Sequence, residues 1–325
     1  VCCARLSLLA LLPATFIVRS SCESVREPLI GEQAYQPIAP KLSEQTVSYV
    51  QSLADGEPHR PLTYVNAREP LFMCFAPKTG CTVWMNFAYY VNENRSLFGQ
   101  PARTVWGQPS SWMKKRWSMR TPGLKDELKA RDRVVIARNP YIRFLSSYLD
   151  WRHRNSKQLR GKNMSFDAFA YEYAKRRAGD KMAFHGFKFL ASHVYPISEV
   201  CRVQTLSIRT YLRMEQMELW YDTFMRHYGL DRFEARLQSE HGRKIYEPNV
   251  TGATTLAEKL SQTIGMALWE GKPKKTEHVT DSAHRLAEFY TPATARLVFD
   301  LQRVDFETFG YPAWDGDPKS FIYAR

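Results

Sequence analysis

The segment LFMCFAPKTGCTVWMNFAYY, residues 71–90, constrains the fold of this chain more than any other. A short apolar run ends at Ala76-Pro77, a polar loop with a single glycine follows, and an apolar and aromatic run then begins at Thr82. This order predicts a buried strand, a tight loop and a helix. Because the first N–H groups of a helix attract anions, the loop is a candidate phosphate-binding site.

The order of residues in this loop argues against a conventional nucleotide kinase. A Walker-type loop places its lysine after the last glycine, whereas Lys78 precedes Gly80 here. The ingredients of an anion site are still present: Gly80 allows close backbone approach, Thr79 and Thr82 supply hydroxyls, and Lys78 supplies charge. A plain strand-to-helix turn with a surface lysine explains the loop equally well when it is considered alone.

A second segment, RNPYIRFLSSY, strengthens the anion-binding interpretation. DRVVIA (132–137) predicts a buried strand, and the residues after it predict a helix with Asn139 as N-cap and Pro140 in its first turn. Arg138 follows the strand directly, and Ser146 lies about two turns into the helix. Because ligands of parallel sheets bind at the carboxyl ends of strands, one anion could bridge both segments. Arginine suits bidentate phosphate binding.

The rest of the chain repeats this organisation. SFDAFAYEYAKRR (165–177) predicts a capped helix, and SIRTYLRME (207–215) predicts a strand that leads into a helix ended by Gly229. Towards the C-terminus, two helices are expected on either side of Thr291-Pro292. Recurring strand-loop-helix units predict an α/β fold with a central parallel sheet flanked by helices.

The N-terminal part differs in composition from the rest. Leu6–Val18 is apolar but short for a membrane span, and is typical of a signal-peptide core or part of a signal-anchor. Residues 21–69 are rich in Pro, Glu, Gln and Ser and predict a stem or linker. We therefore divide the chain into an anchor or signal-peptide remnant (1–20), a stem (21–69) and one domain (70–325).

The net charge indicates which kinds of partner the chain could bind, and the cysteine spacing indicates whether it could hold a metal. The formal charge of +13 favours anionic partners such as nucleotides, nucleic acid, acidic polysaccharides or anionic membranes, although a merely basic surface is the simpler alternative. The basic segments 112–120 and 271–285 could contact such a partner or simply face water. The six cysteines show no metal-ligand spacing, so we expect no metal and leave their pairing open. Sequons at Asn94, Asn163 and Asn249 favour the secretory pathway.

Taken together, PKTGCTVW and RNPYIRFLSSY resemble the cofactor-binding motifs of sulfotransferases, specifically the Golgi carbohydrate sulfotransferase family that includes the HNK-1 and chondroitin 4-O enzymes. HVYPISEVC (193–201) and the C-terminal YTPATARLVFDLQRVDFETFGYP resemble two further motifs of that family. The resemblance spans residues 70–312. Asn139 stands where the family more often has aspartate, and Ile197 where glutamine is frequent.

The resemblance implies a P-loop-NTPase-like three-layer fold and 3′-phosphoadenosine 5′-phosphosulfate as sulfate donor. The residues it assigns to the 5′-phosphosulfate are Lys78, Thr79, Gly80, Cys81, Thr82 and Val83. It assigns the 3′-phosphate to Arg138 and Ser146, with Arg143 nearby. Lys78 would stabilise the leaving group. His193 is the first candidate for the catalytic base, His185 is the second, and a structural histidine is the alternative for His193.

The same resemblance implies a carbohydrate or glycoconjugate acceptor, possibly acidic, and no nucleic acid. We expect a single-pass type II protein of the Golgi membrane with a lumenal catalytic domain, secreted if the N-terminus is cleaved. Two alternatives remain open from the residues alone. One is a P-loop-like nucleotide phosphotransferase, and the other is a non-catalytic protein that binds polyanions.

Overall fold

The computed structural model describes residues 62–94, 131–155, 164–179, 193–241, 282–283 and 285–314. The strands in these ranges are β1 (Thr63–Val65), β2 (Leu71–Cys74), β3 (Asp132–Ala137) and β4 (Thr210–Arg213). The helices are α2 (Cys81–Glu93), α5 (Pro140–Asn155), α6 (Phe166–Arg177), α8 (Ile197–Val200), α9 (Met217–Tyr228), α10 (Asp231–His241), α12 (Leu286–Phe289), α13 (Pro292–Leu301) and α14 (Arg303–Phe309). A short 3-10 turn, η1 (Met214–Gln216), joins β4 to α9.

The described strands form one sheet in the order β1-β2-β3-β4. β2, β3 and β4 are parallel, with Cys74 opposite Val135 and Ala137 opposite Arg213. β1 pairs with β2 in the antiparallel direction. The predicted parallel sheet is therefore confirmed, with one antiparallel strand added at its edge. Because β2 and β3 are parallel, their carboxyl ends lie at the same edge of the sheet. Each of these strands is followed by a helix, β2 by α2 and β3 by α5.

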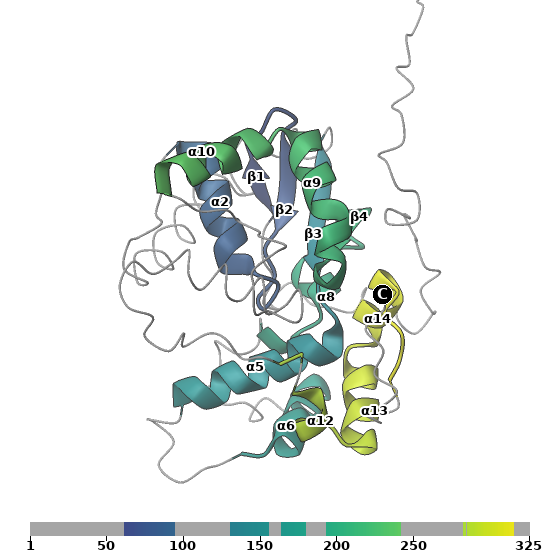
Figure 1. The fold of residues 1–325 in the computed structure, drawn as a ribbon. Helices are drawn as coiled ribbons and strands as arrows, with labels where there is room; N and C mark the ends of the chain where they lie inside the picture. The colour runs from purple at the N-terminus through teal and green to yellow at the C-terminus, as the bar shows by residue number, and fades with distance from the viewer. Residues whose placement is uncertain are drawn as a thin grey trace, which may run out of the picture.

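In Figure 1, α2 and α9 lie alongside the strands, and α5, α6, α12 and α13 lie beyond one end of the sheet. Successive strand residues point to opposite faces. The strand side chains in the core shared with α2 and α9 are Val65, Leu71, Met73, Val134, Ile136 and Leu212. The strand side chains in the core shared with α5, α6, α8 and α12 to α14 are Phe72, Cys74, Val135 and Ala137. This alternation produces the predicted three-layer α/β arrangement.

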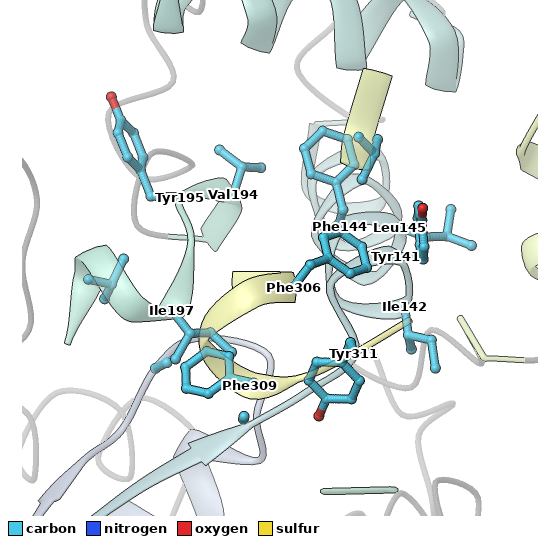
Figure 2. Close-up of a cluster of buried hydrophobic side chains, with 14 of the residues drawn as sticks. Tyr141, Ile142, Phe144, Leu145, Val194, Tyr195, Ile197, Phe306, Phe309 and Tyr311 are labelled. Carbon is cyan, nitrogen blue, oxygen red and sulfur yellow. The ribbon is translucent and has the colours of Figure 1, made fainter. Parts of the chain in front are cut away.

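The second of these cores holds α5 firmly against the C-terminal helices. Figure 2 shows Tyr141 and Phe144 of α5 beside Phe306 of α14, and the Tyr141 and Phe306 ring centroids are 4.8 Å apart. The Tyr141 hydroxyl also accepts a hydrogen bond from the Trp314 amide and donates one to the Trp314 carbonyl oxygen. Burial of one such aromatic side chain contributes about 1.5–3 kcal/mol. The helix that carries Ser146 is thus fixed at its N-terminal end.

Local signals predicted most helix ends correctly. Asn139 Oδ1 accepts hydrogen bonds from the amides of Tyr141 and Ile142, which confirms the N-cap of α5. Gly229 ends α9 with φ 65°. The helix predicted after Thr291-Pro292, however, is two helices, α13 and α14, which meet at Gln302. The buried Gln302 side chain donates to the Val194 carbonyl oxygen, a tertiary contact that accompanies the break.

The sheet includes residues that precede the expected domain start at residue 70. β1 lies at the end of the predicted stem, and Leu62 beside it is fully buried. The predicted anchor and residues 21–61 of the predicted stem lie outside the described residues. Within the described ranges, no helix combines the length and apolar character that a membrane crossing requires.

A disulfide between Cys74 and Cys201 joins the end of β2 to the turn after α8. The two cysteines are 127 residues apart in the chain, so the bond closes a long loop. A crosslink of this span restricts the unfolded chain strongly. It also ties the segment 193–201 to the strand that precedes the Lys78 loop.

Removal of this disulfide by Cys74→Ala together with Cys201→Ala is expected to lower the free energy of unfolding by about 3–5 kcal/mol. Urea unfolding followed by circular dichroism measures the loss, and reduction of the wild-type protein should reproduce it. Cys81→Ala, which removes the buried free thiol, controls for loss of a sulfur without loss of a crosslink. An unchanged urea midpoint in the double variant would contradict the stabilising role.

Candidate active site

The loop between β2 and α2 is tightly folded at the carboxyl edge of the sheet. Lys78 and Gly80 both have φ of 70°. Glycine adopts this left-handed conformation freely, whereas for lysine it is uncommon and costs on the order of 1 kcal/mol. Thr79 is buried, and its hydroxyl donates to the Ala76 carbonyl oxygen at 2.8 Å. The Thr79 side chain therefore stabilises the loop from inside.

The N-terminus of α2 carries neither a side-chain cap nor an acidic residue. Gly80 occupies the N-cap position. Cys81, which starts the helix, is buried. Val83 is also buried, and its amide donates to the Gly80 carbonyl oxygen. This amide is therefore already used in a hydrogen bond of the first helical turn. Thr82 lies in the same first turn, and its side chain is outside the described part. The helix dipole and the first amides thus point at the loop.

Arg138 joins the two segments that the sequence analysis placed together. Its Nη1 donates to the Lys78 carbonyl oxygen at 2.9 Å, and its Nη2 donates to Ser282 Oγ at 3.3 Å. The loop after β2 and the loop after β3 therefore meet, as the parallel register requires. Their expected juxtaposition is confirmed, while the assignment of Arg138 to a phosphate stays a prediction.

The face of α5 towards this edge carries further polar side chains. Ser146 is 3% exposed and Ser147 is 1% exposed. Ser147 Oγ donates to the His193 carbonyl oxygen at 2.8 Å, which brings the buried His193 against α5. The role of His193 as a base stays a prediction. His185, the second candidate, lies outside the described residues.

Lys78 forms an ion pair with Asp150, a contact that the sequence analysis did not predict. Lys78 Nζ lies 2.8 Å from Asp150 Oδ2, and the two side chains are 13% and 2% exposed. Asp150 is four residues after Ser146, so both residues lie on one face of α5. Asp150 is also the only acidic residue within α5. A single acid in this helix was the sequence signal that could have identified it. The candidate site thus contains a buried carboxylate as well as cations.

Arg143, which the resemblance placed near the residues for the 3′-phosphate, binds backbone carbonyl oxygens. Its Nε donates to the Pro77 carbonyl oxygen at 3.1 Å, and its Nη1 donates to the Tyr195 carbonyl oxygen at 2.7 Å. Burial lowers the pKa of Arg143, and the charge of Asp305 opposes that shift. Arg143 therefore connects the Lys78 loop to the segment 193–201 from inside the protein.

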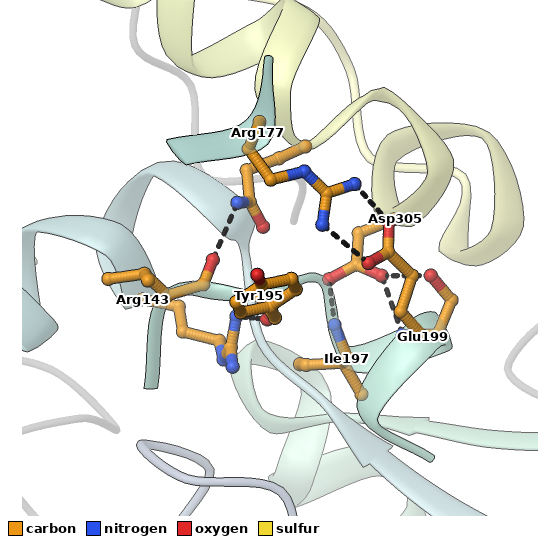
Figure 3. A network of polar contacts seen from close by, with 9 residues as sticks. Arg143, Arg177, Tyr195, Ile197, Glu199 and Asp305 are labelled. Carbon is orange, nitrogen blue, oxygen red and sulfur yellow. Dashed lines mark hydrogen bonds and ion pairs between the residues drawn. The ribbon is translucent and has the colours of Figure 1, made fainter. Parts of the chain in front are cut away.

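Two buried acids hold the segment 193–201 in place, as Figure 3 shows. Asp305 accepts hydrogen bonds from the amides of Ile197 and Ser198 at 2.6 and 2.8 Å and from Ser198 Oγ at 2.6 Å. Burial raises the pKa of Asp305, and Arg143 opposes the shift. Glu199 receives two hydrogen bonds of 2.8 Å from Arg177. These acids position the backbone near the site.

Comparison with known proteins adds one finding. A model of the sulfotransferase family matches residues 61–312, a range that includes every helix and strand of the described part. No curated protein and no solved structure gave a significant match. Among the described residues, no group of His, Cys, Asp or Glu side chains is placed to hold a metal ion.

Proposed function

The chain belongs to the sulfotransferase family, and on this premise we propose that it transfers a sulfuryl group from 3′-phosphoadenosine 5′-phosphosulfate to a hydroxyl of a carbohydrate. Family membership supports sulfuryl transfer in general. The donor, the carbohydrate acceptor and the kinship with HNK-1 and chondroitin 4-O enzymes belong to the proposal. The observation that carries it is the contact of Arg138 with the Lys78 loop at the uncapped start of α2.

The residues present fit a donor with two separate anionic groups. The Lys78 loop and the first turn of α2 would hold the 5′-phosphosulfate, since a helix N-terminus and a lysine both favour negative charge. Arg138, in the loop before α5, and Ser146, in the second turn of α5, would hold the 3′-phosphate. No acidic residue lies in the first turn of α2 to oppose the 5′ group.

Catalysis in this site would be mostly positioning and charge stabilisation. Lys78 would neutralise the charge that builds on the leaving phosphate, and must exchange its partner Asp150 for the donor to do so. The acceptor hydroxyl also has to lose its proton, and a suitably placed base contributes about 10²–10⁴-fold to such a step. His193 is the candidate for this base from the sequence.

The cellular location of the protein and the class of its acceptor are proposed from four features of the chain. A disulfide is typical of an oxidising compartment, and Asn94 of the first sequon is exposed at the end of α2. These features, with the apolar N-terminal segment, support a lumenal domain behind an N-terminal Golgi membrane anchor. The charge of +13 supports an acidic acceptor chain.

Titration with 3′-phosphoadenosine 5′-phosphate tests the donor assignment without any acceptor. We expect calorimetry to show tight binding and a clear preference for this nucleotide over ATP. Arg138→Ala should weaken binding by about 10- to 100-fold, as expected for loss of a hydrogen bond between charged groups. Arg296→Ala, at a residue that is 73% exposed, is the matched control. Preference for ATP would instead favour a nucleotide phosphotransferase.

An acceptor panel then tests the reaction itself. Labelled donor should transfer sulfate to at least one of chondroitin, desulfated heparan and short glycan chains. Tight nucleotide binding without transfer to any carbohydrate would favour a non-catalytic polyanion-binding protein.

A further inference from the structure

Glu215 is an acid at the carboxyl edge of the sheet that the proposed reaction does not use. It lies in the turn η1 directly after β4, and the register of β4 places Arg213 opposite Ala137 of β3. The end of β4 therefore lies beside the end of β3, from which the chain continues to Arg138. A negative charge near a bound anion weakens its binding by repulsion. Charge alone therefore gives Glu215 no favourable role in donor binding.

Both oxygens of the Glu215 carboxylate accept hydrogen bonds. Oε1 accepts from the backbone amide of Asn139, and Oε2 accepts from the Tyr311 hydroxyl, each at 2.8 Å. Burial and the negative charge of Glu215 raise the pKa of Tyr311 well above its usual value, so its hydroxyl remains a donor at neutral pH. The carboxylate thus connects the segment after α14 to the residue that caps α5.

The contact with the Asn139 amide fixes the peptide group that joins Arg138 to Asn139. A peptide group is planar, so its N–H, its carbonyl and both flanking Cα atoms move as one unit. On one side, Ala137 is the last residue of β3 and is paired with β4. On the other side, the Asn139 carbonyl oxygen accepts from the Arg143 amide at 2.9 Å. The backbone is therefore held on both sides of the Arg138 Cα atom, and this sets the direction in which the side chain leaves it.

We propose that Glu215 is a positioning residue that holds Arg138 in the orientation in which it binds the 3′-phosphate of the donor. The inference rests on the proposed function and adds a residue that the sequence analysis did not assign. A binding group that is already oriented loses less conformational freedom when the ligand arrives, and affinity rises accordingly. The same orientation serves the contact of Arg138 with the Lys78 carbonyl oxygen.

Two conservative variants separate the position of Glu215 from its charge. Glu215→Gln keeps the length of the side chain, and its amide can still accept from Asn139 and donate to the Tyr311 oxygen. We expect it to bind 3′-phosphoadenosine 5′-phosphate at least as tightly as the wild-type protein. Glu215→Asp keeps the charge but is one methylene shorter and cannot span both donors. Its Kd, measured by calorimetry, should rise by about 10-fold.

A double-mutant cycle tests whether Glu215 acts through Arg138. In an Arg138→Ala background, Glu215→Asp should cause no further loss of affinity, because the residue that it positions is absent. The kcat of Glu215→Asp at saturating donor should stay close to the wild-type value, while KM for the donor rises. Glu218→Asp, at an exposed acid three residues further on, is the matched control and should leave the Kd unchanged.

Thermal unfolding reports whether each variant is folded. If Glu215→Asp does not fold, Tyr311→Phe takes its place, because it removes the other contact of the carboxylate. Tyr311→Phe should weaken nucleotide binding by a smaller factor, again only while Arg138 is present.

Three results would overturn the inference. The first is a loss of affinity in Glu215→Gln as large as that in Glu215→Asp, which would mean that the charge matters rather than the position. The second is unchanged affinity in the folded shortened variant, or a loss that simply adds to that of Arg138→Ala. The third is wild-type protein that does not bind the nucleotide; this result refutes the proposed function as well, whereas the first two leave it standing.

Discussion

Replacement of Lys78 by alanine is expected to lower kcat for sulfuryl transfer by about 10²–10³-fold, the usual effect of removing one group that stabilises developing charge. We expect this loss because Lys78 carries the positive charge of the loop that leads into α2, where we propose that the leaving phosphate binds. The substitution also leaves Asp150 buried without its lysine, so the double variant Lys78→Ala, Asp150→Asn should be compared to separate stability from catalysis. Steady-state assays with labelled donor measure kcat, and thermal unfolding reports whether each variant is folded.

Lys175→Ala is the matched control for this experiment. Lys175 is 43% exposed and pairs with Glu172 on α6, so its loss removes one positive charge without touching the site. Its turnover should remain close to that of the wild-type protein. A folded Lys78→Ala variant that binds the nucleotide and turns over normally would refute the leaving-group role.

Replacement of Asp305 by alanine is expected to lower the free energy of unfolding by about 3–5 kcal/mol. The carboxylate accepts three hydrogen bonds from Ile197 and Ser198, and its removal would leave these donors buried and unsatisfied. The substitution would also remove the negative charge that stabilises the protonated form of the fully buried Arg143. Urea unfolding measures the loss, and nucleotide affinity should fall with it because Arg143 holds the Pro77 carbonyl oxygen.

Asp300→Ala is the control from the neighbouring helix α13. Asp300 is 41% exposed and pairs with Arg296 and Arg303 at the surface. Loss of such exposed pairs costs at most about 1 kcal/mol. If both variants lost the same stability, burial of Asp305 would not be the cause.

The elements nearest the site could be predicted because their signals are local. An apolar run followed by a polar loop predicted β2 and α2, and Asn139 with Pro140 predicted the start of α5. The meeting of Arg138 with the Lys78 loop also followed from the sequence, since parallel strands end at one edge. Neither argument required knowledge of how distant segments pack.

The remaining features depend on contacts between distant segments. Cys74 and Cys201 are 127 positions apart in the chain, and Arg143 and Pro77 are 66 positions apart. The ion pair of Lys78 with Asp150 likewise joins the loop after β2 to the far part of α5. Periodicity and capping carry no information about which distant side chain faces a given position. At the break between α13 and α14, the Gln302 side chain likewise contacts a distant residue, Val194.

The sequence by itself therefore determined the strand-loop-helix units, the α/β class and the resemblance to sulfotransferases, because each depends on neighbouring residues and their spacing. Only the tertiary structure decided that Arg143 is a buried connector and that a carboxylate faces Lys78. The physical reason is that burial and charge pairing are properties of a packed interior. In that interior, α5 places Arg143 against the Pro77 backbone and Asp150 against Lys78, which no local pattern encodes.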